Sequence, residues 1–259
     1  MRSPVDEQVL GSGISLIFPV YNEALIIEDT VRNYYDELNG KLPFELIVAE
    51  DGSTDDTKTV VGRLERTLPI RVYTSDVRKG YLDAVKDALT LAKRDWIFLV
   101  DSDYQFAAID FWRLAPSMAT HDIILGMKSP RRDPFYRIVL SRGLNLLLRL
   151  LFHVPYRDMD TGFRLIRREP VERIAPQVRH FAFFTAEFVV RCHHAGYRIC
   201  EVPVPHYSRK EGASNIFFIP KMPGIVLQQL RGIWRLRQEM SQKDMRDKSS
   251  IETPRPLDT

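Results

Sequence analysis

The chain has 259 residues, of which 44% are hydrophobic and 27% are charged, and its formal net charge is +3. This composition predicts a folded globular protein with a substantial core, and it excludes fibrous and largely disordered chains. A net charge this small gives no argument for nucleic acid as a partner. No apolar run reaches ~18 residues, so no transmembrane helix is predicted, and the N-terminus lacks the pattern of a signal peptide.

The first half of the chain alternates apolar runs of strand length with stretches of helical periodicity. After a flexible N-terminus at residues 1–13, we expect strands at residues 14–20, 45–49, 70–73 and 96–100, with helices at residues 26–38, after residue 56 and at residues 80–93. The alternation predicts an α/β fold with a mostly parallel central sheet and helices on both faces. In such sheets, ligands bind at the carboxyl ends of the strands.

Acidic residues follow several of these strands. Glu23 comes after the first strand, Glu50 and Asp51 end the second, and Asp101 and Asp103 follow the fourth. Carboxylates gathered at one edge of a sheet repel one another unless a cation or hydrogen-bond donors lie among them. The pattern therefore indicates a ligand or cation site at this edge.

The segment Asp101-Ser102-Asp103-Tyr104-Gln105 carries most of this argument. If the chain stays extended there, alternate residues point the same way, so Asp101, Asp103 and Gln105 would share one face. Two carboxylates and an amide oxygen suit Mg²⁺ or Mn²⁺, completed by water and substrate phosphates. We therefore predict a divalent metal site that offsets charge on a departing diphosphate. Capping of the next helix is the alternative role for the two aspartates.

The second half of the chain is less regular. We expect strands at residues 122–126, 161–166 and 198–204, and helices at residues 135–152 and 185–195. A C-terminal amphipathic extension at residues 216–240 would face a membrane or a protein partner. The polar tail at residues 241–259 is expected to be disordered.

A set of segments in a fixed order covers residues 14–215: Pro19–Glu23, Glu50–Thr57, Asp101–Gln105, Asp158–Arg164, Val202–Val204 and His206–Ser214. Together they resemble the family 2 glycosyltransferases of the GT-A fold. The resemblance is greatest to the dolichol-phosphate mannosyltransferase and polyprenyl-phosphate glycosyltransferase branch. It implies a GT-A (Rossmann-like) domain over residues 14–215, a nucleotide-sugar donor and inversion at the anomeric carbon.

The resemblance also implies roles for individual residues. The nucleotide sugar would be bound by Pro19, Tyr21, Glu23, Asp51, Gly52 and Lys128, and by Arg209 and Lys210 of a mobile loop. The metal ligands would be Asp101, Asp103 and Gln105. Arg137 and Ser141 would hold the phosphate of the acceptor. Lys128 stands where relatives often carry an arginine, so it would act as a point charge and not as a bidentate fork.

The segment Ile138–Phe152 bears on the nature of the acceptor. One narrow polar stripe is formed by Ser141, Arg142, Asn145 and Arg149, and apolar side chains cover most of the remaining surface. Such a helix suits a membrane interface, and it equally suits a core or a protein partner. Arg137 and Ser141 would place an anion site beside an apolar surface, which matches a phosphate head on a prenyl tail.

We therefore predict a glycosyltransferase that moves a sugar from a GDP- or UDP-sugar to a polyprenyl phosphate. A phosphate oxygen is already ionised at neutral pH, so positioning and leaving-group stabilisation would suffice. One alternative is a glycan hydroxyl acceptor, which needs a carboxylate base, with Asp158, Asp160 and Glu187 as candidates. Another is a non-catalytic subunit that binds nucleotide sugars.

The expected location is the cytoplasmic face of a membrane, with the protein held peripherally. Residues 216–240 and the basic residues near them would rest on the bilayer or dock on a separate membrane-anchor subunit. A homodimer through the same surface is a further alternative. The identity of the sugar, the nucleotide, the prenyl length and the choice between Mg²⁺ and Mn²⁺ stay open at this point.

Overall fold

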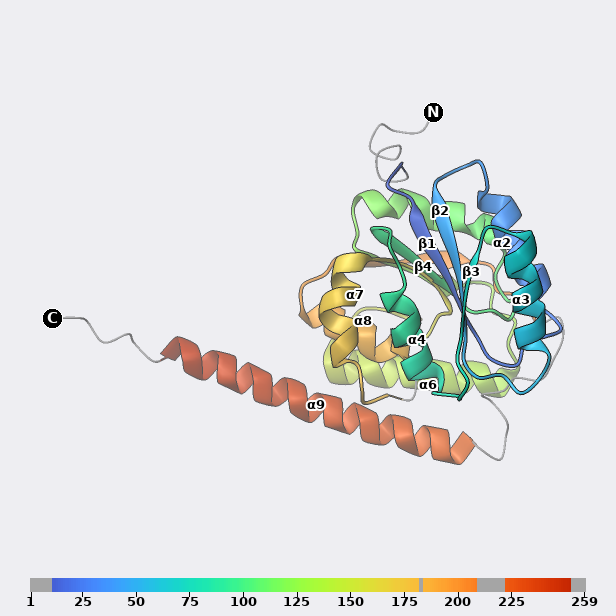
Figure 1. Cartoon of the computed structure of the whole chain (residues 1–259). Helices are drawn as coiled ribbons and strands as arrows, with labels where there is room; N and C mark the ends of the chain where they lie inside the picture. The colour runs from blue at the N-terminus through green and yellow to red at the C-terminus, as the bar shows by residue number, and fades with distance from the viewer. Residues whose placement is uncertain (1–10, 182–183, 209–221, 253–259) are drawn as a thin grey trace.

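A seven-stranded sheet organises the computed structural model, which describes residues 11–181, 184–208 and 222–252 (Figure 1). Its strands lie in the order β3-β2-β1-β4-β6-β5-β7. Their bounds are β1 (Ile14–Val20), β2 (Phe44–Glu50), β3 (Arg71–Thr74), β4 (Trp96–Val100), β5 (Ile123–Lys128), β6 (Phe163–Arg167) and β7 (Ile199–Val204). The predicted strands are therefore confirmed, with shifts of one or two residues at several ends.

Strand direction explains how the two halves of the chain meet. β1 pairs in parallel with β2 and β4, β2 pairs in parallel with β3, and β5 pairs in parallel with β7. β6 is the exception, because it runs antiparallel to both β4 and β5. The loop that precedes β6 therefore lies at the same edge as the loops that follow β1, β2, β4, β5 and β7.

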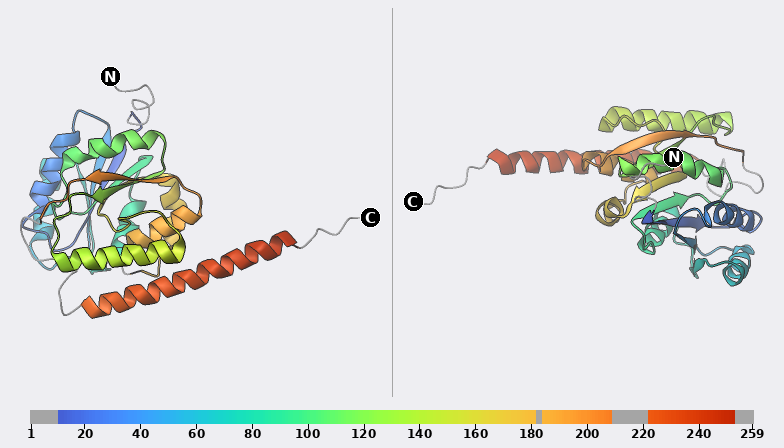
Figure 2. Two further views of the ribbon diagram at one scale, coloured as in Figure 1. Left: turned by 180° about the vertical axis from the view of Figure 1, so that it is seen from behind. Right: turned by 90° about the horizontal axis from the view of Figure 1, so that it is seen from above.

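Helices cover both faces of the sheet (Figure 2). The α-helices are α2 (Ile27–Leu38), α3 (Thr57–Thr67), α4 (Tyr81–Thr90), α5 (Phe111–Leu114), α6 (Phe135–Phe152), α7 (Arg168–Ile174), α8 (Phe184–His194) and α9 (Met222–Glu252). Short 3-10 turns are η1 (Ala108–Asp110), η2 (Ala115–Ala119) and η3 (Ala175–Gln177). Of the helices in this part of the chain, none is long and apolar enough to cross a bilayer.

Two hydrophobic cores form because both faces of the central strands are buried. In β1, Leu16 and Phe18 belong to the core that includes Tyr34 of α2. Ile17 points to the opposite face, where the core includes Val85 of α4. The continuous apolar runs read from the sequence arise from this burial on both sides.

The structure differs from the sequence expectation in two places. The short helices α5 and α7 were not predicted, because four and seven residues are too few to show helical periodicity. Residues 241–252, expected in a disordered tail, instead continue α9 to Glu252. This stretch contains no glycine or proline and includes good helix formers such as Gln242, Lys243 and Met245.

Candidate active site

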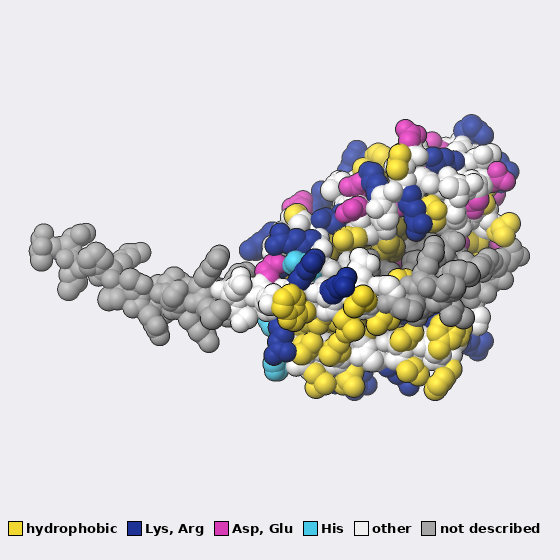
Figure 3. All heavy atoms as spheres, turned by 90° about the horizontal axis from the view of Figure 1, so that it is seen from below, with side chains coloured by type: hydrophobic (Ala, Val, Ile, Leu, Met, Phe, Trp, Pro, Cys, Tyr) yellow, Lys and Arg dark blue, Asp and Glu magenta, His cyan; other side chains and the backbone are white. Residues whose placement is uncertain are grey.

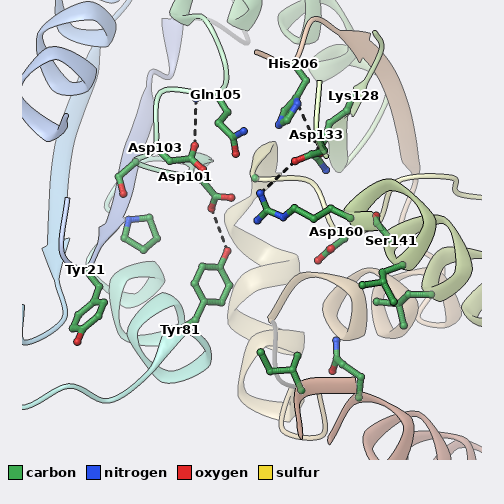
Figure 4. A pocket seen from close by; sticks show the side chains of 18 of the residues that line it. Tyr21, Tyr81, Asp101, Asp103, Gln105, Lys128, Asp133, Ser141, Asp160 and His206 are labelled. Carbon is green, nitrogen blue, oxygen red and sulfur yellow. Dashed lines mark hydrogen bonds and ion pairs between the residues drawn. The ribbon is translucent and has the colours of Figure 1, made fainter. Parts of the chain in front are cut away.

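A cavity of about 580 Å³ lies at the carboxyl ends of the parallel strands, where the sheet pattern predicted a ligand site. One end is lined by residues that follow β1, β2 and β4, including Tyr21, Asp51 and Asp101. The middle is lined by Lys128 at the end of β5. The other end runs between α6 and α9, so the cavity joins the two halves of the chain (Figure 4).

Asp101, Asp103 and Gln105 line this cavity and lie together on one side of it (Figure 4). The predicted grouping is therefore seen, but its expected cause is wrong. The segment is a turn and not an extended chain, since Tyr104 has a positive φ of 60°. The turn is closed by a hydrogen bond of 3.3 Å from the Gln105 backbone N–H to Asp103 Oδ1.

The Asp101 carboxylate is held in place from two directions. The Tyr81 hydroxyl donates a hydrogen bond of 3.3 Å to its Oδ1. A Cβ on Gly162 would lie 1.8 Å from its Oδ2, so this carboxylate fills space that only a glycine leaves free. The Asp101 backbone N–H also donates to the Gly162 carbonyl at 2.8 Å. The loop before β6 thus shapes one of the predicted metal ligands.

The donor set fits a hard divalent cation on chemical grounds. Among the residues that the structure describes, no three His, Cys, Asp or Glu side chains converge into a metal site. Asp101 and Asp103 would contribute carboxylate oxygens and Gln105 an amide oxygen, which leaves positions for water or phosphate oxygens. Mg²⁺ and Mn²⁺ sites in phosphoryl chemistry commonly use so few protein ligands.

Asp51 fixes a loop at the end of the cavity that is lined by the residues after β1 and β2. Its two carboxylate oxygens accept the backbone N–H groups of Lys79 at 2.8 Å and Gly80 at 3.0 Å. The same loop carries Arg78, whose guanidinium carbon lies 3.8 Å from the centre of the Tyr21 ring. Asp51 and Tyr21 line the cavity as predicted, and Arg78 is a lining residue that the sequence reasoning missed.

Backbone conformation and backbone hydrogen bonds position other residues that were predicted to bind the nucleotide. Gly52 has a φ of 66°, and a Cβ there would lie 2.5 Å from the Arg78 backbone nitrogen, so its role is close approach of two loops. Pro19 and Glu23 line the cavity. The Glu23 backbone N–H donates to Thr57 Oγ1 at 2.9 Å, which ties the end of β1 to α3.

A basic cluster lies beyond the acidic end. Arg131 donates one hydrogen bond of 2.6 Å to Asp133 and another of 2.9 Å to Ser141 Oγ. Arg137 lies 3.5 Å from the other carboxylate oxygen of Asp133. The predicted residues Arg137 and Ser141 therefore both line the cavity, but the arginine that contacts Ser141 is Arg131.

His206 closes this cluster from the β7 side. It is buried, its ring packs edge-on against Phe106, and its Nδ1 lies 3.9 Å from the Asp133 carboxylate. Burial lowers the pKa of His206 to about 4, with Lys128 and Arg131 adding to the effect and Asp133 opposing it. The imidazole is therefore neutral at physiological pH, so Asp133 forms its ion pairs with Arg131 and Arg137.

The candidate bases have different environments. Burial raises the pKa of Asp158, but the charge and hydrogen bonds of Lys128 outweigh it and lower the pKa overall. Lys128 Nζ lies 3.0 Å from Asp158 Oδ1, so this carboxylate is an ionised partner for the lysine. Burial raises the pKa of Asp160, Asp158 adds to that rise, and Lys128 opposes it. Only Asp160 of the three candidates lines the cavity.

Glu187 does not belong to the site. Its buried carboxylate accepts backbone N–H groups from Arg179, His180 and Phe181 and the side chain of Arg191. These contacts give Glu187 a structural role, which corrects its prediction as a candidate base. Arg209 and Lys210, the predicted basic residues of a mobile loop, lie outside the described residues.

Solved structures identify the fold. Glucosyl-3-phosphoglycerate synthase from Mycobacterium tuberculosis, solved with Mn²⁺, UDP and glucosyl-3-phosphoglycerate, has a TM-score of 0.68 at 18% identity, covering 92% of this chain and 86% of that one. A mannosyltransferase from Pyrobaculum calidifontis, in complex with GDP-Man and Mn²⁺, has a TM-score of 0.59 at 21% identity, covering 83% and 62%. The shared fold is that of the GT-A enzymes.

The family follows from the sequence match. Residues 15–175 match the family model "Glycosyl transferase family 2", and the chain belongs to this family. It is a glycosyltransferase, so the predicted family, fold and enzyme class are confirmed. The family therefore supports an enzyme over the alternative of a non-catalytic subunit.

Several relatives cover most of the chain. Glycosyltransferase AglD of Haloferax volcanii is 33% identical over 91% of this chain, which spans 39% of that protein. Dolichyl-phosphate beta-glucosyltransferase of Dictyostelium discoideum is 26% identical over 91% of this chain and 79% of that protein. Dolichol-phosphate mannosyltransferase of Pyrococcus furiosus is 26% identical, covering 92% and 67%. The chain thus spans less than half of the Haloferax relative.

Proposed function

We propose that this chain transfers a sugar from a nucleoside diphosphate to a polyprenyl phosphate. One observation carries the proposal: a single cavity runs from Asp101 and Asp103, past Arg131 and Arg137, into an apolar groove between α6 and α9. A nucleotide sugar matches the first end, a phosphate the middle and a prenyl chain the last. The names of the Dictyostelium and Pyrococcus relatives support a lipid phosphate as acceptor.

The donor half would bind and orient the nucleotide sugar. Tyr21 and Arg78 form a stacked wall for the nucleoside, and Asp51 holds the loop that carries Arg78. Asp101, Asp103 and Gln105 would hold a divalent cation, as the Mn²⁺ in related structures suggests. When bound, that cation supplies positive charge beside the diphosphate. Mg²⁺ and Mn²⁺ both fit this donor set.

The acceptor half would hold an anion. Arg131, Arg137 and Lys128 bring positive charge to the middle of the cavity wall, where Asp133 holds the two arginines and Asp158 pairs with Lys128. An acceptor phosphate placed there is ionised, so its oxygen attacks the anomeric carbon without losing a proton. These residues therefore act by positioning and charge, and not as bases.

A glycan hydroxyl acceptor is the second candidate, and Asp160 favours it. Its raised pKa and its place in the cavity wall are the properties expected of a carboxyl that takes up a proton. Arg137→Ala separates the two acceptors. A large loss of transfer to prenyl phosphate supports the proposal, whereas turnover of sugar hydroxyls alone overturns it.

The direct test is a donor screen. GDP- and UDP-sugars are offered with a short polyprenyl phosphate, in Mg²⁺, in Mn²⁺ and in EDTA, and lipid-linked sugar is measured. Metal-dependent transfer to the lipid phosphate is expected. Transfer that continues unchanged in EDTA would contradict the metal site, and absence of lipid-linked product with every donor would contradict the acceptor.

The proposed place of action is the cytoplasmic face of a membrane, because the acceptor tail is insoluble in water. A membrane-anchor subunit and a homodimer are further proposals that the sequence raised for the C-terminal segment. Light scattering of the purified chain, with and without detergent, measures the oligomeric state.

A further inference from the structure

We propose that the exposed faces of α6 and α9 form a docking surface for an anionic lipid bilayer. This inference rests on the proposed function, because the bilayer would also be the source of the acceptor. α6 and α9 contact one another and lie side by side beneath the sheet in the view of Figure 1. Together they present one outer surface, which we call the α6–α9 face.

Large apolar side chains are exposed along both helices of the α6–α9 face. On α6, Phe135 is 80% exposed and Leu150 is 66% exposed; on α9, Trp234 is 62% exposed. Further exposed members are Tyr136, Val139, Leu140, Leu146, Val226, Leu227 and Leu230. Figure 3 looks at the molecule from below, and hydrophobic side chains gather across the lower part of that view. An exposed apolar patch of this kind marks a site of interaction with a membrane or with another protein.

The charges beside the patch have one sign. α6 contains no Asp or Glu, and residues 224–238 of α9 contain none either. Arg142 and Arg149 on α6, and Arg231, Arg235 and Arg237 on α9, are exposed. Arginines beside exposed leucine and tryptophan are the composition of helices that lie in a bilayer interface. The positive sign of these charges favours anionic headgroups, because basic residues near a bilayer surface are attracted to anionic lipids.

The cavity opens toward the same surface. Val139 and Leu140 of α6, and Val226 and Leu230 of α9, line the cavity and are also exposed. A lipid that entered between these residues would keep its tail in the bilayer while its phosphate reached Arg131. The geometry therefore makes the α6–α9 face both a docking surface and the entrance for an acceptor.

A second copy of the chain is the rival occupant of this face. Like-charged arginines would then face one another across the dimer interface, because the patch carries basic residues on both helices. Anionic lipid relieves that repulsion and a second copy does not. The charge pattern therefore favours the bilayer.

Vesicle flotation tests the proposal with the full chain. Vesicles of phosphatidylcholine alone are compared with vesicles containing phosphatidylglycerol, at low and high salt. The expected result is binding to the anionic vesicles that weakens as salt rises. Leu150→Glu combined with Trp234→Glu should weaken this binding by about tenfold or more. The double variant removes two apolar side chains that would be buried in the bilayer, and it adds two negative charges.

A matched control uses an exposed apolar residue elsewhere. Leu25 is 74% exposed and lies just before α2, so Leu25→Glu should leave vesicle binding unchanged. Circular dichroism and thermal unfolding verify that all variants are folded. Donor binding, measured by calorimetry with a nucleotide diphosphate, should be unchanged in the double variant, which separates failure of docking from failure of the proposed function.

Three outcomes would overturn the docking surface. One is a wild-type chain that does not bind anionic vesicles at low salt, and another is a double variant that binds them as well as wild type. The third is a dimer in light scattering that the double variant converts to a monomer without a change in vesicle binding. In that case the α6–α9 face is an interface between copies.

Discussion

Arg131 donates a hydrogen bond of 2.9 Å to the Ser141 hydroxyl, which joins the turn before α6 to the second turn of that helix. The same guanidinium contacts Asp133 through its Nε. Asp133 also holds Arg137, so one carboxylate keeps two arginines at the cavity wall. The phosphate site that we propose therefore depends on an arginine whose role was not predicted from the sequence.

Replacement of Arg131 by alanine should weaken use of the lipid phosphate. A hydrogen bond to a charged group contributes about 1.5–3 kcal/mol, so kcat/KM for the acceptor should fall roughly 10–150-fold. The measurement is transfer at varied prenyl phosphate concentration in detergent. Arg132→Ala is the matched control, because Arg132 is exposed and is absent from the cavity wall. Equal losses in both variants would contradict a specific role for Arg131.

Replacement of Gly162 by alanine should disturb the proposed metal site. The new Cβ would lie 2.3 Å from Asp101 Cγ, so the carboxylate must move away. We expect transfer to fall about 100-fold or more, because misplaced catalytic groups lose rate steeply. Titration with Mn²⁺ in the presence of a nucleoside diphosphate should show weaker binding.

Gly62 in α3 offers the control for that substitution. A Cβ there meets nothing within 4 Å, so Gly62→Ala should keep full activity and stabilise the fold by about 0.5–1 kcal/mol. Wild-type activity in the Gly162→Ala variant would remove the argument that this glycine shapes the metal site.

The Asp160 carboxyl distinguishes the two acceptor classes. With a phosphate acceptor, Asp160→Asn should reduce kcat by less than about tenfold, because no proton leaves the nucleophile. With a hydroxyl acceptor, loss of the base should reduce kcat about 10²–10⁴-fold. The pH dependence of kcat gives a second readout, since a base of raised pKa would impose an acid limb that the asparagine variant lacks.

Glu239 should make stability depend on pH. Hydrogen bonds from Arg191, and then from His180 and Arg179, lower the pKa of Glu239 to about 2. A lowered pKa means that the stabilisation is complete above the ordinary value of 4.5 and is lost as pH falls toward 2. After allowance for the partial exposure of the carboxylate, the contribution is on the order of 1–2 kcal/mol.

Urea unfolding at pH 6 and pH 3 measures this contribution. Wild type should lose more stability between these pH values than Glu239→Gln, since the glutamine cannot titrate. Gln238→Ala is a matched control because Gln238 is exposed on the same turn of α9. The same pH dependence in wild type and in Glu239→Gln would mean that Glu239 does not anchor α9.

Much of the fold was predictable because buried strands and helices produce apolar patterns in the local sequence. The apolar runs of β1 and β4 and the acidic residues after them predicted a ligand site at the edge of the sheet where the cavity lies. α6 was predicted with the observed bounds, because its apolar residues recur over eighteen residues. A pattern of this length predicts both the type of secondary structure and the face that is buried.

Contacts between segments that are distant in the sequence produce no local sequence pattern. Tyr81 reaches Asp101 from α4, and Gly162 reaches it from the loop before β6, neither of which any spacing in the sequence indicates. Arg131 meets Ser141 because the chain folds back before α6. Glu187 fits a candidate base in the sequence, because a carboxylate on a predicted helix shows the same pattern whether it faces a cavity or a buried arginine.

The reversed direction of β6 has a consequence for how specificity could diversify in this scaffold. Lys128, Arg131, Arg137 and Asp160 all lie on the excursion between the start of β5 and the start of β6, whereas Tyr21, Asp51 and Asp103 lie on the earlier strand ends. Because β6 runs antiparallel to its neighbours, this whole segment returns to the edge of the sheet where we propose that the nucleotide binds. If the proposed roles hold, substitution, lengthening or exchange of this one contiguous stretch would change the acceptor, while the residues proposed to bind the donor would stay unchanged.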